Sequence, residues 1–177
     1  SWDETYALNT TITQMLYMEP DMGTFVASQP RAHKPGTHLQ YSSGSTTLLC
    51  SILAKNHGGA NMPREQIFAP LGLANAVMEP DGVGTPVCSS YMWATPREWA
   101  AVGQFALQDG VWNGQRLLPE GWMAESTQAV NVKSQEDAPY GSGWWTNKAP
   151  DGTLEHPSLP ADAYFAQGHD GQRINIV

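Results

Sequence analysis

The sequence predicts an α+β fold, in which helices come first and antiparallel strands follow. Of its 177 residues 41% are apolar and only 15% are charged, a balance that supports a buried core and excludes a disordered chain. Helical spacing of apolar residues recurs before Pro139, whereas the later segments are aromatic and Gly-rich, as strands are. We therefore expect one domain, residues 1–177, that is mainly helix and loop over about 1–138 and sheet strands over about 139–177.

The helical region is predicted from apolar spacing and from the Pro and Gly residues that end each segment. In the clearest segment, apolar residues recur at i, i+1, i+4 and i+5, namely Leu48, Leu49, Ile52 and Leu53. This stripe predicts an amphipathic helix from residue 44 to about residue 56. Shorter helices are expected around 21–29, 64–69 and 119–123. Residues 2–18 are mixed, because Ile12, Met15 and Leu16 have helical spacing but follow an Asn-Thr-Thr run that disfavours a helix.

One further helix has a well-marked start. Thr95-Pro96-Arg97-Glu98 places a capping Thr, a Pro at the first helical position and a Glu three residues after the cap. Glu98 is therefore expected to be a capping-box carboxylate. The predicted buried face of this helix consists of Trp99, Val102, Phe105 and Ala106.

Strands are expected over 140–146, 163–166 and 173–177. The segment 167–172 contains Asp170-Gly171, which predicts a hairpin turn between the last two strands. Trp144 and Trp145 are adjacent in a strand and must face opposite sides, so at most one of them can line a cleft. Core packing is the alternative for each of them.

Composition excludes several classes of function. The net charge of −8 argues against nucleic acid and against an anionic membrane surface as partners. No apolar run approaches the roughly 20 residues of a membrane span. Cys50 and Cys88 are expected to be two reduced, buried thiols, and the five histidines lack metal-ligand spacing, so neither a metal nor another cofactor is expected.

The most informative segment is 35–44, which reads Pro-Gly-Thr-His-Leu-Gln-Tyr-Ser-Ser-Gly. It resembles a stretch of the penicillin-recognising serine hydrolases, which include class C β-lactamases, D-Ala-D-Ala peptidases, esterases and hydrolases of aminohexanoate oligomers. Further segments resemble this family in the family's order, namely 67–73, 89–100, 110–122, 140–144 and 168–171. Residues 2–6 and the Gly-His-Asp-Gly-Gln run are most similar to the esterase and aminohexanoate-oligomer hydrolase branch.

The resemblance implies a β-lactamase/transpeptidase-like fold, partial in this chain, and hydrolysis of an amide or ester through an acyl-enzyme. In this family a Tyr acts as general base and acid, and Tyr41 matches it. Ser43 matches a position that usually holds Asn and orients the substrate. His169 matches a Lys that supports the substrate carboxylate or the oxyanion.

Three further residues complete the candidate site that the resemblance implies. The backbone N–H of Gln172, next to Gly171, matches an oxyanion-hole donor. Trp144 is a candidate substrate contact. The structural alternatives are a half-buried Tyr41 with a satisfied hydroxyl, a helix N-cap for Ser43 and an exposed turn residue for His169.

The family's Ser-x-x-Lys nucleophile motif is absent from these 177 residues. The resemblance therefore implies a nucleophile outside them, with the remainder of the same polypeptide as partner and a small-molecule amide or ester as substrate. Two alternatives stay open: a non-catalytic penicillin-recognition-like binding module, and a true β-lactamase. Ser43 in place of Asn and His169 in place of Lys count against strong penicillin turnover. The sequence does not distinguish periplasm from cytoplasm.

Overall fold

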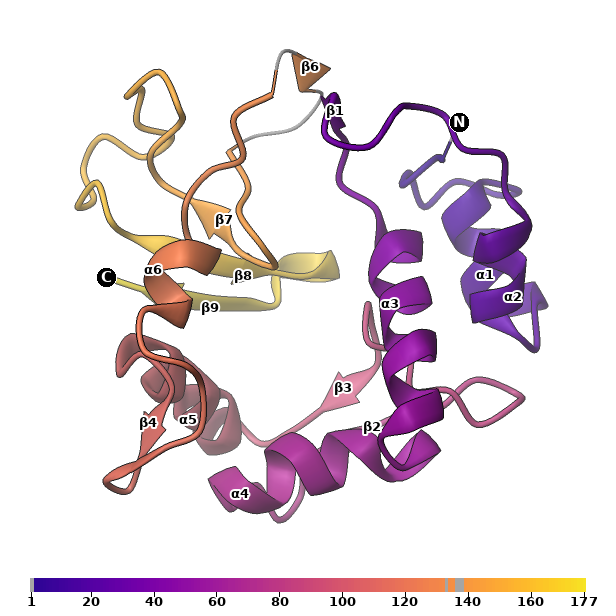
Figure 1. Cartoon of the computed structure of the whole chain (residues 1–177), viewed down its shortest axis with the longest axis horizontal. Coiled ribbons are helices and arrows are strands. Elements are labelled where there is room, and N and C mark those ends of the chain that lie inside the picture. The colour runs from indigo at the N-terminus through magenta and orange to yellow at the C-terminus, as the bar shows by residue number, and fades with distance from the viewer. Residues whose placement is uncertain (1, 133, 136–138) are drawn as a thin grey trace. The chain divides into compact units, whose positions relative to one another are not determined.

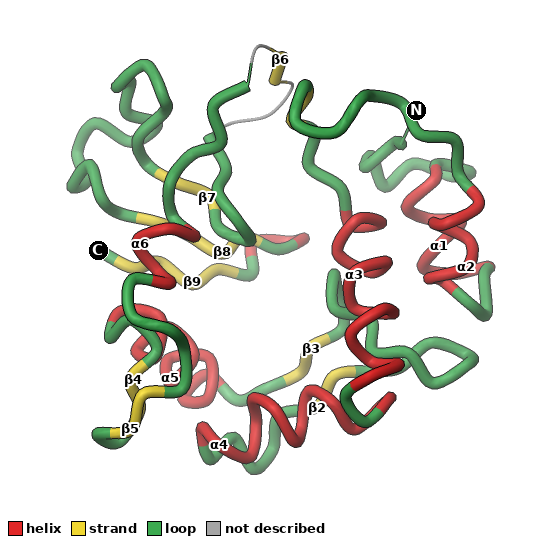
Figure 2. The backbone as a smooth tube through the Cα atoms, viewed as in Figure 1, coloured by secondary structure: helices red, strands yellow, loops and turns green. Residues whose placement is uncertain are grey.

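The computed structural model describes residues 2–132, 134–135 and 139–177, and it confirms the α+β class (Figures 1 and 2). The α-helices are α1 (Thr11–Met18), α2 (Met22–Ser28), α3 (Ser43–Asn56), α4 (Ala69–Leu71), α5 (Pro96–Leu107) and α6 (Trp122–Ser126). A π-helical turn, Arg64–Phe68, leads directly into α4.

The strands are short, and several of them precede the region where the sequence predicted a sheet. They are β1 (His38–Leu39), β2 (Val77–Met78), β3 (Met92–Trp93), β4 (Val111–Trp112), β5 (Gln115–Arg116), β6 (Ser134–Gln135), β7 (Trp145–Thr146), β8 (Tyr164–Gln167) and β9 (Arg173–Ile176). The predicted sheet is β7-β8-β9, and both of its pairings are antiparallel.

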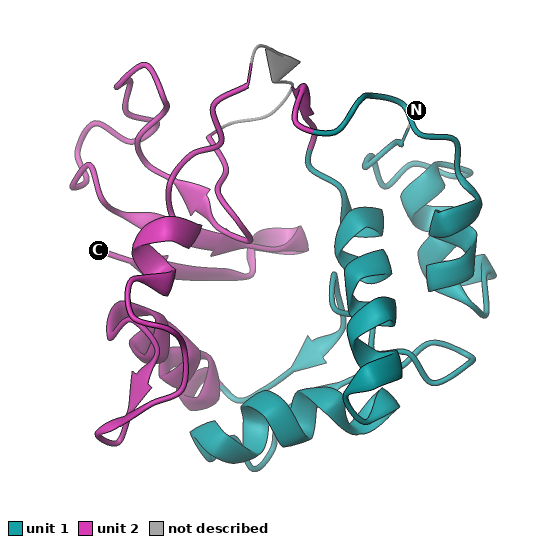
Figure 3. Cartoon of the chain, in the orientation of Figure 1, with its two compact units in different colours: residues 1–35, 41–95 teal, residues 36–40, 96–177 magenta. Residues whose placement is uncertain are grey.

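The chain forms two compact units, coloured separately in Figure 3. The first consists of residues 1–35 and 41–95, and the second of residues 36–40 and 96–177.

In the first unit, α1, α2 and α3 pack together around a small core. Its buried apolar members are Ile12, Met15, Leu16, Met22 and Val87. Asp21 caps α2 by accepting a hydrogen bond from the Thr24 N–H, at 2.9 Å. Helices α2 and α3 approach so closely that a Cβ on Gly23 would lie 2.7 Å from the Ser51 Cβ. Only glycine allows this contact.

The close approach of α2 decides which face of α3 is buried. The apolar stripe correctly predicted the helix, but Leu49, Ile52 and Leu53 are 63%, 51% and 51% exposed. The residues that pack are instead small or polar, namely Ser43, Gly44, Thr47, Cys50, Ser51 and Ala54. Large side chains do not fit against α2, so the stripe faces away from the core of this unit.

A disulfide joins Cys50 on α3 to Cys88, with their Cα atoms 6.0 Å apart. The expectation of two reduced thiols was therefore wrong. The cysteines are 38 residues apart in sequence, and only the fold of the intervening chain brings Cys88 to α3. Beside the disulfide, the hydroxyls of Thr47 and Ser89 form a hydrogen bond at 3.0 Å.

In the second unit, α5 packs against β9. Gly103 on α5 would place a Cβ 3.0 Å from Ile174 Cγ2, so the helix lies close to the sheet there. The predicted buried face is found only in part. Ala106 is buried as expected, whereas the three larger predicted residues of that face are half-buried and Glu98 is buried instead.

Asn147 organises the long connection between β7 and β8. It has no exposed surface. Its Nδ2 donates to the carbonyls of His156, Leu159 and Pro160 at 3.1, 3.3 and 2.8 Å, and its Oδ1 accepts from the His156 N–H at 2.7 Å. One side chain thus fixes three points of a loop whose backbone would otherwise lack these partners.

We expect Asn147→Ala to lower the free energy of unfolding by about 3 kcal/mol, because several buried backbone groups lose their partner at once. Urea denaturation measures this loss. Asn61→Ala is the matched control, since Asn61 is exposed and its φ is not positive, and it should change stability by less than about 0.5 kcal/mol. Equal stability of the two variants would contradict the role given to Asn147.

Candidate active site

The Tyr41-Ser42-Ser43 segment lies at the start of α3. Ser42 is the N-cap: its backbone is extended, and its hydroxyl accepts a hydrogen bond from the Ser45 N–H at 3.1 Å. The capping alternative considered for Ser43 therefore belongs to Ser42. Tyr41 precedes the cap by one residue and is half-buried. The cap therefore fixes the residue at which the helix begins, and with it the position of Tyr41 just before the helix.

Ser43 is buried, with 5% of its surface exposed, and it is held by a carboxylate that the sequence did not single out. Its hydroxyl donates to Glu4 Oε2 at 3.0 Å, and its backbone N–H donates to Glu4 Oε1. The Trp2 indole Nε1 donates to the same Oε1 at 2.5 Å. The Ser43 hydroxyl thus donates its hydrogen bond to Glu4. Toward a ligand, its oxygen can act only as a hydrogen-bond acceptor.

Trp2 completes this arrangement by packing on the first turn of α3. A Cβ on Gly44 would overlap the Trp2 ring, so a larger residue there would displace the ring from the helix. The Glu4 carboxylate lies at the helix N-terminus, where unpaired backbone N–H groups favour a negative charge. Residues near the beginning of the chain therefore hold the segment that contains Tyr41. From the sequence alone, residues 2–6 indicated only which branch of the family the chain resembles, and not this contact.

We expect Glu4→Ala to lower the free energy of unfolding by about 1–3 kcal/mol, because the buried Ser43 N–H and hydroxyl lose their acceptor. Amide hydrogen exchange should show faster exchange at Ser43. Glu120→Ala, at an exposed position, is the control and should leave both measurements unchanged. Unaltered protection of the Ser43 amide in Glu4→Ala would show that Glu4 does not hold the helix start.

The β8–β9 hairpin carries the second group of candidate residues. The predicted turn is confirmed: β8 and β9 are antiparallel, and the Gly168 N–H donates to the Gln172 carbonyl at 2.8 Å. Asp170 and Gly171 have positive φ values of 55° and 82°. His169 has 58% of its side chain exposed, and its Nε2 lies 3.6 Å from Asp170 Oδ1.

The backbone N–H of Gln172 is the expected oxyanion-hole donor. In this structure it donates to the His169 carbonyl at 3.5 Å, a long hydrogen bond within the turn. Gly171, just before Gln172, has a positive φ of 82° in this turn.

The two tryptophans at β7 contact different partners. Trp144 packs edge to face on Tyr164 at 5.2 Å, whereas Trp145 packs on Tyr140 at 4.8 Å and is paired in register with Phe165. Successive residues of β8 point to opposite sheet faces, so the two tryptophans do so as well. Burial, together with the Asp109 carboxylate, raises the pKa of the Tyr164 phenol.

A pocket of about 350 Å³ lies on the Trp145 and Phe165 face of the sheet, next to the stem of the β8–β9 hairpin. Its charged or ionisable lining residues are Glu155, His156 and Arg173. None of the three was predicted as a site residue from the sequence, since they lie in no motif and come together only through the loop that Asn147 holds.

The candidate residues are divided between the two compact units. Tyr41 and Ser43 lie in the first unit, and Trp144, His169, Gly171 and Gln172 in the second. Among residues 2–132, 134–135 and 139–177, no group of three or more His, Cys, Asp or Glu side chains is placed to hold a metal ion. Within the same residues, no helix combines the length and apolar character that crossing a membrane requires.

Comparison with known proteins adds two findings. The family model described as Beta-lactamase matches residues 4–176. No curated protein matches the chain significantly.

Solved structures share the fold. A proposed 6-aminohexanoate-dimer hydrolase from Bacillus anthracis is 24% identical, with a TM-score of 0.67 over 86% of this chain and 38% of that one. A proposed beta-lactamase from Bacteroides dorei is 16% identical, with a TM-score of 0.69 over 90% and 53%. A beta-lactamase from Mycobacterium bovis is 16% identical, with a TM-score of 0.61 over 80% and 53%. The chain thus spans between 38% and 53% of the length of these structures.

Proposed function

Because the chain belongs to the Beta-lactamase family, we propose that it is part of a serine hydrolase that cleaves an amide or ester bond through an acyl-enzyme. The observation that carries this proposal is the placement of Tyr41. It is half-buried directly before the cap of α3, next to a Ser43 that Glu4 holds in place. A residue that transfers protons needs such a fixed position, because its oxygen must lie within hydrogen-bond distance of the group that gives or takes the proton.

In the proposed reaction, a serine outside residues 1–177 attacks the substrate carbonyl and gives its proton to the Tyr41 phenolate. The tetrahedral intermediate collapses, and the leaving amine or alcohol takes that proton from Tyr41. Water then attacks the resulting acyl-serine ester, which releases the acid and regenerates the serine. The Gln172 N–H donates to the developing oxyanion in place of the His169 carbonyl. His169 supports the substrate carboxylate when it is protonated, and Trp144 contacts the substrate.

The proposed partner is the remainder of the same polypeptide, which supplies the nucleophile. The solved structures with this fold are about two to three times as long as the part matched here, since that part covers 38% to 53% of them. The exposed stripe of Leu49, Ile52 and Leu53 on α3 offers apolar surface for that remainder to cover.

The proposed substrates are small esters or linear amides rather than penicillins. Ser43 offers a ligand fewer hydrogen-bonding groups than Asn would, and its hydroxyl already donates a hydrogen bond to Glu4. His169 is only partly cationic near neutral pH, so it holds a carboxylate more weakly than Lys. The likeness to a proposed 6-aminohexanoate-dimer hydrolase supports the same class.

The test uses the intact protein with every segment it possesses. After incubation with a fluorophosphonate, intact mass and peptide mapping should show one adduct, on a serine outside residues 1–177. Hydrolysis of p-nitrophenyl butyrate should exceed that of nitrocefin. Absence of any adduct would favour the non-catalytic binding module. Nitrocefin turnover comparable to that of an efficient β-lactamase would favour the true β-lactamase.

A further inference from the structure

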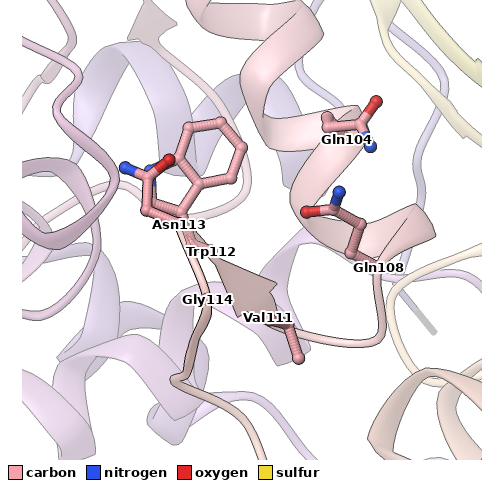
Figure 4. Close-up of a pocket in the computed structure, with 6 residues that line it drawn as sticks. All are labelled: Gln104, Gln108, Val111, Trp112, Asn113 and Gly114. Atoms are coloured by element: carbon pink, nitrogen blue, oxygen red, sulfur yellow. The ribbon is translucent and has the colours of Figure 1, made fainter.

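A second pocket, outside the candidate active site, lies in the second unit between the end of α5 and the β4–β5 hairpin. Its volume is about 630 Å³. The lining residues, drawn in Figure 4, are Gln104, Gln108, Val111, Trp112, Asn113 and Gly114. All of them come from one continuous stretch of chain, so the pocket is built locally.

The pocket is lined by an indole and three primary amides, with no charged side chain among its lining residues. Each amide offers both donors and an acceptor. Gln104, Gln108 and Asn113 are exposed, and in the described part of the chain no hydrogen bond of their amide groups to protein is found. Their hydrogen-bonding capacity is therefore free for a ligand.

Arg116 on β5 and Asp109 beside Gln108 form an ion pair and so neutralise each other. Arg116 donates to the Asp109 carboxylate at 3.1 Å, and that carboxylate also accepts the N–H groups of Gly121 and Met123 at 2.8 and 2.9 Å. A phosphate or carboxylate ligand would find no available cation among the lining residues, and the net charge of −8 repels anions as well. The chemistry of the pocket thus favours a neutral ligand.

The backbone holds these groups in fixed positions. Asn113 and Gly114 form the two-residue turn between β4 and β5, with φ values of 48° and 79° that suit a tight hairpin. Trp112, just before the turn, is anchored by its pairing with Gln115. Gln104 lies in the last turn of α5, and Gln108 directly follows the helix, where its N–H donates to the Gln104 carbonyl at 3.0 Å (Figure 4).

We propose that this pocket binds a neutral saccharide. An apolar C–H face of a pyranose ring would pack on Trp112, whereas its hydroxyl or acetamido groups would bond to the three amides. Each sugar hydroxyl can both donate and accept a hydrogen bond. A primary amide matches it, because its N–H groups donate and its carbonyl oxygen accepts. The proposal does not depend on hydrolysis, and its test is independent of the active site.

Calorimetric titration of the intact protein tests the proposal with chitotriose, maltotriose and inorganic phosphate as probes. At least one trisaccharide should bind, and phosphate should not. The double variant Gln104→Ala/Gln108→Ala should bind about tenfold more weakly or worse, since two ligand contacts are lost. Both positions are exposed, and Gln104 lies in α5, so alanine at these positions preserves folding.

Trp112→Ala should bind the trisaccharide about tenfold more weakly, because the ring on which the sugar would pack is lost, and Trp122→Ala is its matched control. Trp122 is 47% exposed in the same unit but does not line the pocket, so its variant should bind as the unaltered protein does. Failure of both trisaccharides at about 10 mM would overturn the proposal. Preferential binding of phosphate, or undiminished binding by the glutamine double variant, would overturn it as well.

Discussion

Tyr41→Phe in the intact protein is expected to lower kcat/KM for ester hydrolysis by about 10²- to 10⁴-fold, the usual contribution of a positioned general acid or base. The substitution removes only the phenolic oxygen that takes the proton from the nucleophile and passes it to the leaving group. The free energy of unfolding should change by less than about 1 kcal/mol, because the ring and its packing remain. Steady-state kinetics and urea denaturation of the same sample measure both quantities.

Tyr17→Phe is the control for this experiment. Tyr17 is 68% exposed in the same unit and belongs to no motif, so its loss of a hydroxyl should not affect kcat/KM. The pH dependence of kcat/KM gives a second readout, since the limb that reports the base should change in Tyr41→Phe alone. A Tyr41→Phe protein that folds normally and retains full activity would remove Tyr41 from proton transfer.

The second large effect concerns the disulfide. Replacing both Cys50 and Cys88 with Ser should lower the free energy of unfolding by about 4 kcal/mol, because the unfolded chain is freed from a closed loop. The bond spans 38 residues and anchors α3 about two turns after Ser43, so the helix start that positions Tyr41 should also become less stable. Urea denaturation with and without reductant measures the effect.

Alkylation with iodoacetamide checks the bond directly. Protein that is denatured without reductant should gain no mass, and after reduction it should gain two labels. Ser89→Ala, which removes only the neighbouring hydrogen bond to Thr47, should cost about 1 kcal/mol and serves as the control. Two labels in the unreduced sample would show that the thiols are free, as the sequence analysis expected.

Much of the fold could be predicted because it depends on local patterns. The Pro and Asp before α2, the Thr-Pro start of α5 and the Asp-Gly turn between β8 and β9 each act within a few residues. A cap or a turn is stabilised by its own neighbours in sequence, so one sequence suffices to find it. The short strands β2 and β3 lack such a pattern, because two residues are too few to show an alternation. Strands β4 and β5 do have a local signal, the Asn113-Gly114 turn between them, which the prediction from sequence did not use.

The candidate site was predictable only as a set of residues and not as a set of contacts. The motif indicated Tyr41 and Ser43, but the carboxylate that holds Ser43 comes from Glu4, 39 residues earlier. The expected substrate-side residues of the hairpin were found in the turn that Asp170-Gly171 predicted. Their hydrogen bonds depend on positive φ values that a sequence pattern does not specify.

The sequence by itself determined the class of fold, the main helices, the last hairpin and the family motifs, since these depend on spacing along the chain. The tertiary structure alone decided that Cys50 meets Cys88 and that α3 turns its small residues toward α2 while Leu49 faces outward. Both outcomes depend on which segments meet in space. Helix packing selects side chains by the room a neighbour leaves, and a stripe of large apolar residues does not reveal that room.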